Sequence, residues 1–134
     1  MLHLNRSPDI LVVEDEDNIA LALDWLLARE GYRHVRIDRG DAALGAIRQL
    51  RPALVLLDVM LPGASGYEVC QSVRADPDLG RTRILMMTAR GSALEQRRGR
   101  ALGADGFIAK PFDLAELRFE IRRLITAQAN GSAG

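Results

Sequence analysis

Chemically reactive side chains stand in this sequence at the ends of its short apolar segments. They are Glu14 and Asp15 after residues 10–13, Asp58 after residues 53–57, Thr88 after residues 84–87 and Lys110 after residues 107–109. In an open α/β sheet, ligands bind at the carboxyl ends of the strands. If these segments are neighbouring strands, the side chains therefore meet in one cleft.

The side-chain types in this set indicate phosphoryl transfer assisted by a metal ion. Clustered carboxylates repel one another unless a hard cation lies among them, and Mg²⁺ prefers oxygen ligands. A carboxylate such as Asp58 can attack phosphorus when the charge of the transferring group is neutralised and its geometry is fixed. The metal and Lys110 would each neutralise part of that charge, and the Thr88 hydroxyl can donate to a phosphoryl oxygen. The adjoining Glu16 and Asp17 are interpreted only as favourable charges at the start of the following helix.

The elements that must position these residues alternate between strand and helix. Continuous apolar runs predict strands buried on both faces of a parallel sheet, and an alternating run predicts an edge strand. The predicted strands are 10–13, 34–38, 53–57, 84–87 and 107–109. Apolar spacing, N-cap residues and glycine or proline stops predict helices around 19–27 and over 41–50, 65–75, 92–102 and 113–125. The fold class is therefore α/β, a doubly wound parallel sheet with helices on both faces.

Composition narrows the class of protein further. The chain has 134 residues, and its 18 basic residues cancel its 18 acidic ones, which argues against non-specific nucleic-acid binding by this chain. Its apolar segments are too short to span a bilayer, and residues 1–8 lack the apolar core of a signal peptide. The single cysteine, Cys70, permits no internal disulfide and fits a reducing, cytoplasmic compartment. We expect an N-terminal extension over 1–8, one domain over 9–126 and a flexible tail or linker over 127–134.

Four motifs together resemble the receiver domain of two-component response regulators. They are Ile10-Leu-Val-Val-Glu-Asp-Glu-Asp17, Val55-Leu-Leu-Asp-Val-Met-Leu-Pro-Gly63 followed by Gly66, Met87-Thr-Ala89, and Gly103-Ala-Asp-Gly-Phe-Ile-Ala-Lys-Pro-Phe112. The resemblance runs in order from about Asp9 to about Ile125, and four motifs in register are far more specific than one. It implies a flavodoxin-like three-layer sandwich with strand order 2-1-3-4-5 and five helices.

The resemblance also implies a role for each matching residue. Asp58 accepts the phosphoryl group; Thr88 and the amide of Ala89 hold its oxygens, and Lys110 pairs with it. Asp15 binds Mg²⁺ directly, Glu14 binds it through water, and Asp58 and the backbone carbonyl of Met60 complete the ligands. Thr88, Phe107 and Pro111 form the switch, with Pro111 following a cis peptide bond. The implied partners are a histidine kinase or phosphotransfer protein and an unknown downstream effector, with no membrane and no direct nucleic-acid contact.

Each assignment has a purely structural alternative. Asp58 can cap a helix, Thr88 can saturate a turn, and Lys110 can be a surface lysine. Glu14 and Asp15 can favour the dipole of the next helix. The alternative carries most weight for Phe107, because a strand phenylalanine usually belongs to the core.

The resemblance implies a phosphorylation-dependent signalling switch, in which the face of the fourth helix, fifth strand and fifth helix changes to control a partner or effector. Two other functions are alternatives to it. A magnesium-dependent hydrolase with an aspartate nucleophile often carries a second carboxylate two residues after the nucleophile, where this chain has Met60. A phosphorylation-independent interaction module would not need intact Asp58, Asp15, Thr88 and Lys110. No nucleotide-binding glycine motif is present in the sequence.

A partner face is expected from apolar residues that lie off the core stripes of their helices. Leu21 and Trp25 on the first helix and Phe119 on the fifth are its apolar members, although packing against a neighbouring element can also explain them. Similar receivers attached to winged-helix transcription factors dimerise through charges at positions that here hold Gln96, Gly106 and Glu120. Because those charges are absent or reversed, we expect no symmetric dimer of that type.

Overall fold

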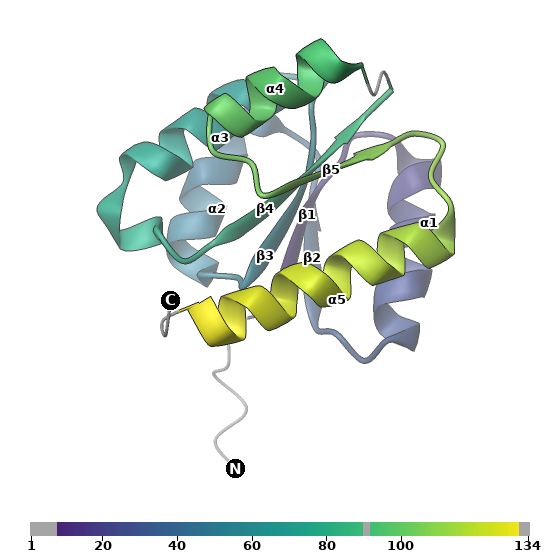
Figure 1. The fold of residues 1–134 in the computed structure, drawn as a ribbon. Coiled ribbons are helices and arrows are strands. Elements are labelled where there is room, and N and C mark those ends of the chain that lie inside the picture. Colours follow the sequence, from purple (N-terminus) through teal and green to yellow (C-terminus); the bar gives the residue numbers. More distant parts are fainter. Residues whose placement is uncertain (1–7, 90–91, 132–134) are drawn as a thin grey trace.

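Five short parallel strands form the middle layer of the molecule, and helices cover both faces (Figure 1). The computed structural model describes residues 8–89 and 92–131. The strands are β1 (Ile10–Val13), β2 (His34–Ile37), β3 (Leu54–Asp58), β4 (Arg83–Thr88) and β5 (Gly106–Ala109). They pair in the order β2-β1-β3-β4-β5, so the predicted order is confirmed. This order lays β1 beside β3, and therefore brings residues 14 and 58 to neighbouring strand ends.

The helices begin and end where the local chemistry requires. They are α1 (Asp17–Arg29), α2 (Ala43–Leu50), α3 (Gly66–Ala75), α4 (Ala93–Ala101) and α5 (Leu114–Gly131). Ser65 and Ser92 cap α3 and α4 by accepting from the backbone amides three residues later. Asp113 accepts from the amide of Ala115 at 2.8 Å and so begins α5. Gly31 takes a positive φ of 82° directly after α1, as an αL helix stop requires.

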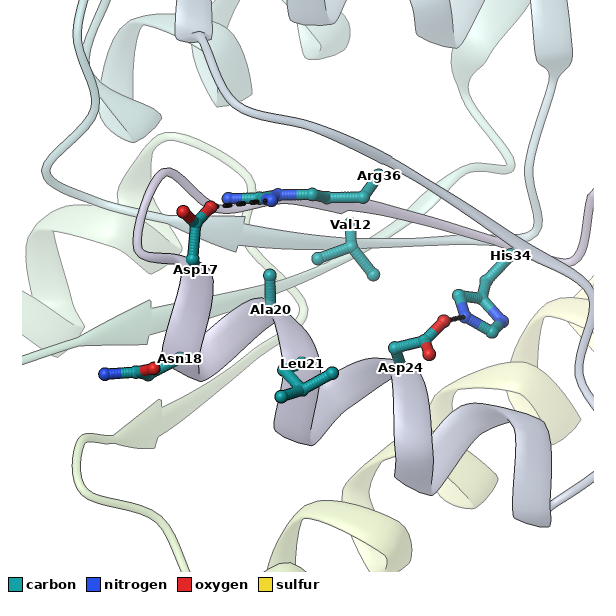
Figure 2. Close-up of a pocket in the computed structure, with 8 residues that line it drawn as sticks. All are labelled: Val12, Asp17, Asn18, Ala20, Leu21, Asp24, His34 and Arg36. Carbon is teal, nitrogen blue, oxygen red and sulfur yellow. Dashed lines mark hydrogen bonds and ion pairs between the residues drawn. The ribbon is translucent and has the colours of Figure 1, made fainter.

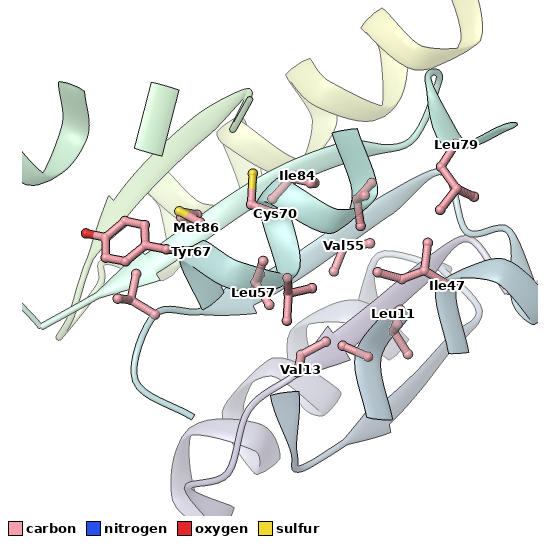
Figure 3. Close-up of a cluster of buried hydrophobic side chains, with 14 residues drawn as sticks. Leu11, Val13, Ile47, Val55, Leu57, Tyr67, Cys70, Leu79, Ile84 and Met86 are labelled. Atoms are coloured by element: carbon pink, nitrogen blue, oxygen red, sulfur yellow. The ribbon is translucent and has the colours of Figure 1, made fainter. Parts of the chain in front are cut away.

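Two apolar clusters hold the layers together, one on each face of the sheet. Alternate residues of the central strands point to opposite faces, because the side-chain period of a strand is two. On one face, α2 and α3 pack against Leu11, Val13, Val55 and Leu57, as Figure 3 shows. On the other face, α1 and α5 pack against the alternate strand residues Ile10, Val12, Leu54 and Leu56. Each fully buried aliphatic side chain contributes roughly 1.5–3 kcal/mol, so the middle of the sheet is the rigid support of the strand ends.

Several boundaries differ from the sequence-based expectation. Short 3₁₀ helices occur at Gly40–Ala42 and Pro77–Leu79; the first lies at the start of the helix expected over 41–50. α5 continues to Gly131, so 127–131 are helical where a flexible tail was expected, because no proline or glycine interrupts the helix before Gly131. Residues 1–7 of the expected extension and 132–134 of the expected tail lie outside the described residues. Across 8–89 and 92–131, no helix combines the length and apolar character needed to cross a membrane.

Candidate functional site

The loop between β1 and α1 carries two carboxylates of very different exposure. Glu14 is fully buried, whereas Asp15 is exposed. The amide of Glu14 donates to the carbonyl of Ile37 at 3.0 Å, which extends the β1–β2 ladder by one residue. The Glu14 carboxylate accepts from the amide of Glu16 at 3.0 Å, so the loop folds back around it. A buried charge of this kind requires a partner.

Lys110 supplies that partner. Its Nζ lies 2.8 Å from Glu14 Oε1 and 3.2 Å from Asp58 Oδ2, between the two carboxylates. Burial by itself lowers the pKa of the ammonium, but hydrogen bonds and attraction from Glu14 and Asp58 outweigh burial and raise the pKa. Lys110 is therefore positively charged in this cleft.

Asp58 ends the buried strand β3 and is only 4% exposed. Loss of hydration and the nearby Glu14 carboxylate raise its pKa from 3.8 to about 6, against the opposing effect of Lys110. The amide of Met60 donates to Asp58 Oδ1 at 3.3 Å. Two backbone contacts fix the loop that follows: the amide of Gly66 donates to the carbonyl of Val59, and that of Gly40 donates to the carbonyl of Pro62.

Thr88 ends β4 and is buried, and its carbonyl accepts from the amide of Lys110 at 2.7 Å. This bond ties the threonine strand end directly to the lysine strand end. Ala89 follows in an exposed position, and the Lys110–Pro111 peptide bond is cis, as the resemblance implied. The three strand ends β3, β4 and β5 thus contribute an acid, a hydroxyl and an ammonium to one region.

Glu14, Asp15 and Asp58 each offer a carboxylate oxygen, and these oxygens lie within 4.8 Å of one another. An all-oxygen set with a net negative charge suits a hard divalent cation such as Mg²⁺, which retains several waters and takes few carboxylates. The donor set therefore fits the metal that the sequence predicted. The side chain of Met60 points to solvent with 74% of its surface exposed, so only its backbone is available to such an ion.

A cleft of about 400 Å³ begins beside Lys110 and Ala89 and extends along the start of α1. Its lining also includes four residues that were not predicted as site residues, namely Asn18, Ile19, Ala22 and Phe112. Three of them are apolar and typical of packing, and a single asparagine carries no specific chemical signal. Only the proximity of α1 to the β5–α5 loop brings them to the site.

Phe107 lies on β5 and is half-buried, with its ring against Gly99 of α4. A Cβ at position 99 would overlap that ring. The ring also packs against the cluster formed with α2 and α3. Its position fits both the switch and the core interpretation.

The four residues of the expected partner face do not lie in one layer. Leu21 and Trp25 are exposed on α1, and Phe119 is exposed on α5, in the layer that packs on one face of the sheet. Gln96 lies on α4, in the opposite layer (Figure 1). Trp25 is further covered by Arg29, whose guanidinium carbon lies 5.3 Å from the ring centre.

Comparisons with known proteins point to one family and one architecture. The family model described as "Response regulator receiver domain" matches residues 10–122. The phosphate regulon transcriptional regulatory protein PhoB of Rhizobium meliloti is 42% identical over 118 residues, which cover 88% of this chain and 52% of that protein. The sensory transduction protein RegX3 of Mycobacterium tuberculosis is 39% identical over 116 residues, or 87% of this chain and 50% of that protein. The chain thus spans about half the length of these relatives.

Among solved structures, the receiver domain of the sensor histidine kinase PA1611 from Pseudomonas aeruginosa superposes with a TM-score of 0.81 at 28% identity. The match covers 90% of this chain and 98% of that one, and its structure contains a magnesium ion coordinated in the active-site cleft. Chemotaxis protein CheY4 of Vibrio cholerae superposes with a TM-score of 0.80 at 30% identity over 86% of this chain and 96% of that one.

Proposed function

This chain belongs to the response-regulator receiver domains of two-component signalling, and from that premise we propose that Asp58 is its phosphoryl acceptor. The observation that carries the proposal is the position of the Lys110 ammonium, 3.2 Å from the buried Asp58 carboxylate and 2.8 Å from Glu14. This arrangement gives a nucleophilic oxygen and a fixed positive charge at one point, which is what phosphoryl transfer to a carboxylate requires.

In the proposed reaction, an Asp58 oxygen attacks the phosphorus of a phosphohistidine on a partner kinase or phosphotransfer protein. The new P–O bond forms as the P–N bond breaks, and the donor imidazole keeps the electron pair and takes up a proton. Lys110 neutralises charge on the transferred group, while the Thr88 hydroxyl and the Ala89 amide donate to its oxygens. Later attack of water on phosphorus would return the free carboxylate and inorganic phosphate.

Glu14, Asp15, Asp58 and the Met60 carbonyl would hold Mg²⁺ beside the acceptor. When bound, the ion neutralises charge on the phosphoryl oxygens and separates the carboxylates electrostatically. The buried Glu14 carboxylate and its bond to the Glu16 amide keep one side of this site fixed before any ion arrives.

Phosphorylation is proposed to change the face formed by α4, β5 and α5, and so to control an unknown effector. Thr88 is linked to β5 through its carbonyl, and Phe107 on β5 contacts α4 at Gly99, which supports a route from Asp58 to that face. The phosphoryl group would shift an equilibrium between two conformations of this face. A cytoplasmic location belongs to the same proposal and is supported by the single cysteine, Cys70, which permits no internal disulfide.

The proposal is tested with phosphoramidate, a small donor that has the P–N bond of phosphohistidine. With Mg²⁺, the chain should gain about 80 mass units, the mass of one phosphoryl group, by intact-mass spectrometry. Chelation of Mg²⁺ should abolish the gain, and so should Asp58→Asn. An undiminished gain in Asp58→Asn would overturn the assignment of the acceptor.

A further inference from the structure

A groove of about 460 Å³ lies between α1 and the edge strand β2 (Figure 2). Two side-chain contacts cross it from strand to helix. His34 Nε2 lies 2.6 Å from Asp24 Oδ1, and Arg36 Nη1 lies 3.1 Å from Asp17 Oδ1. Both contacts join a basic side chain of β2 to a carboxylate of α1, but only the one from Arg36 reaches the acidic loop, residues 14–16.

Arg36 makes a second contact with the acidic loop, whereas the second contact of His34, between Nδ1 and the Tyr32 carbonyl at 3.2 Å, does not involve that loop. Its Nε donates to the backbone carbonyl of Glu14 at 2.9 Å. One guanidinium therefore joins the first residue of the acidic loop to Asp17, the first residue of α1, and Asp15 lies between these two points. The planar fork of arginine suits such a two-point contact, because its donors keep a fixed relative geometry.

The ion pair between Arg36 and Asp17 contributes little electrostatic stabilisation. Asp17 is 92% exposed at its side chain, and water screens exposed pairs strongly. The contact with the Glu14 carbonyl is a geometric restraint on the backbone at the metal site. We propose that Arg36 is a positioning residue, which holds the loop of Glu14 and Asp15 in the conformation that binds Mg²⁺.

This inference rests on the proposed function, because it concerns the same metal site. Its test distinguishes two roles of Arg36 that change the affinity for Mg²⁺ in opposite directions. If Arg36 acted only as a nearby positive charge, Arg36→Gln would remove repulsion and tighten Mg²⁺ binding. If Arg36 positions the loop, the same change weakens binding. Groups that hold metal ligands in place change affinity by 10- to 100-fold when removed, and the partial exposure of Arg36 puts the expectation near tenfold.

The experiment is calorimetric titration of the purified chain with MgCl₂, without any phosphoryl donor. The Kd for Mg²⁺ should rise about tenfold in Arg36→Gln. It should also rise in Arg36→Lys, which keeps the charge but cannot make both contacts in the fork geometry. His34→Asn is the matched control, because it removes the other strand–helix pair of the same groove and should leave Kd unchanged. Saturating Mg²⁺ should restore the rate of phosphorylation in both Arg36 variants.

The outcomes distinguish this inference from the proposal it rests on. A Kd that stays equal or falls in Arg36→Gln, in protein whose circular dichroism and thermal midpoint match those of His34→Asn, would overturn the positioning role. Equal increases in Kd for Arg36→Gln and His34→Asn would also overturn it, since they would indicate a general loss of α1–β2 packing. Failure of the unaltered chain to bind Mg²⁺ would contradict the metal site itself, and the inference with it.

Discussion

Asp58 and Glu14 are two buried carboxylates that share one ammonium, and this imbalance has a measurable consequence. Loss of hydration and the nearby Glu14 carboxylate together raise the pKa of Asp58 to about 6, because one lysine compensates two buried acids. Between pH 4 and 6 the folded state then keeps a proton on Asp58 that the unfolded state has lost. Because the folded state binds more protons at Asp58 in this window, the contribution of Asp58 to the free energy of unfolding falls as pH rises through it.

We therefore predict that Asp58→Asn stabilises the metal-free chain at neutral pH. A shift of about two pKa units corresponds to roughly 2–3 kcal/mol of folding stability, which the unaltered chain loses as the pH rises to 6–7. The variant has no titrating carboxyl at position 58 and does not undergo this loss. Urea unfolding in EDTA should give a higher free energy of unfolding for Asp58→Asn at pH 7.5, and the difference should shrink toward pH 4. The exposed Asp38→Asn serves as control and should show no such convergence. Parallel pH profiles for Asp58→Asn and the unaltered chain would contradict the predicted repulsion.

Asp15 differs from Glu14 in being exposed, so its role as a ligand can be tested without disturbing the fold. We predict that Asp15→Asn weakens Mg²⁺ binding by at least about tenfold, because a charged oxygen ligand is lost, and leaves the thermal midpoint nearly unchanged. Calorimetric titration with Mg²⁺ measures both binding constants. Glu16→Gln, the next residue of the same loop, should bind Mg²⁺ as the unaltered chain does. The assignment fails if the two variants have the same affinity.

At the scale of single residues, the sequence was informative wherever a polar side chain ends a buried strand. The sequence predicts that Asp58, Thr88 and Lys110 meet, because the carboxyl ends of adjacent parallel strands share one edge of the sheet. The contacts of Lys110 with Asp58 and Glu14 agree with this prediction. Nothing in the sequence around Arg36 predicts a role for it at the site. The role proposed for Arg36 depends on the pairing of Val12 with Arg36 across β1 and β2, which brings the guanidinium to the Glu14 carbonyl. A helix-dipole role was the only one that sequence could suggest for Asp17.

Among the elements, α4 and β5 meet at an unusually close contact between Gly99 and the Phe107 ring. We predict that Gly99→Ala destabilises the chain by about 1 kcal/mol: overpacking costs about 1–3 kcal/mol and better helix propensity returns about 1. In a Phe107→Ala background the overlap is gone, so Gly99→Ala should instead stabilise by about 1 kcal/mol. Urea unfolding of the four proteins gives the coupling energy as a double-mutant cycle.

Gly45 provides the matched control for that cycle. It lies exposed in α2 with open space around the position of a Cβ, so Gly45→Ala should stabilise the chain by about 1 kcal/mol in either background. The prediction for Gly99 and Phe107 fails if their two substitutions change the free energy of unfolding additively. Additivity would show that the Phe107 ring does not lie on α4 in solution.

The elements themselves followed from sequence with two kinds of exception. Capping residues such as Ser65 and Asp113 marked helix starts correctly, because their side chains satisfy backbone amides that otherwise lack partners. The end of α5 was placed too early, since the segment Ala127-Gln-Ala-Asn130 contains no proline or glycine and its alanines are strong helix formers. The 3₁₀ helix Pro77–Leu79 was not foreseen; its N-cap bond from Asp78 to Asp76 is a local contact with a weak sequence signal.

For the molecule as a whole, the question is how phosphorylation changes assembly. The positions that carry dimer charges in similar winged-helix regulators are Gln96, Gly106 and Glu120 here. Gly106 offers no side chain, and Glu120 is already paired within α5 by Arg123 at 2.6 Å. We predict that the symmetric dimer of the winged-helix type does not form when beryllofluoride mimics the phosphoryl group, as measured by light scattering after size exclusion and by a structure of any dimer found. A two-fold dimer through α4, β5 and α5, with Glu120 paired across it, would contradict this expectation.

The position of the phosphoryl group on the chain tests the central claim most directly. After reaction with phosphoramidate and Mg²⁺, borohydride reduces an acyl phosphate on aspartate to homoserine, which tandem mass spectrometry of the peptides can locate. The account predicts homoserine at position 58 and at no other aspartate, because Asp58 ends the central strand β3 beside Lys110, whereas Asp15 is exposed. Homoserine at Asp15 or at another position, with Asp58 unchanged, would contradict it.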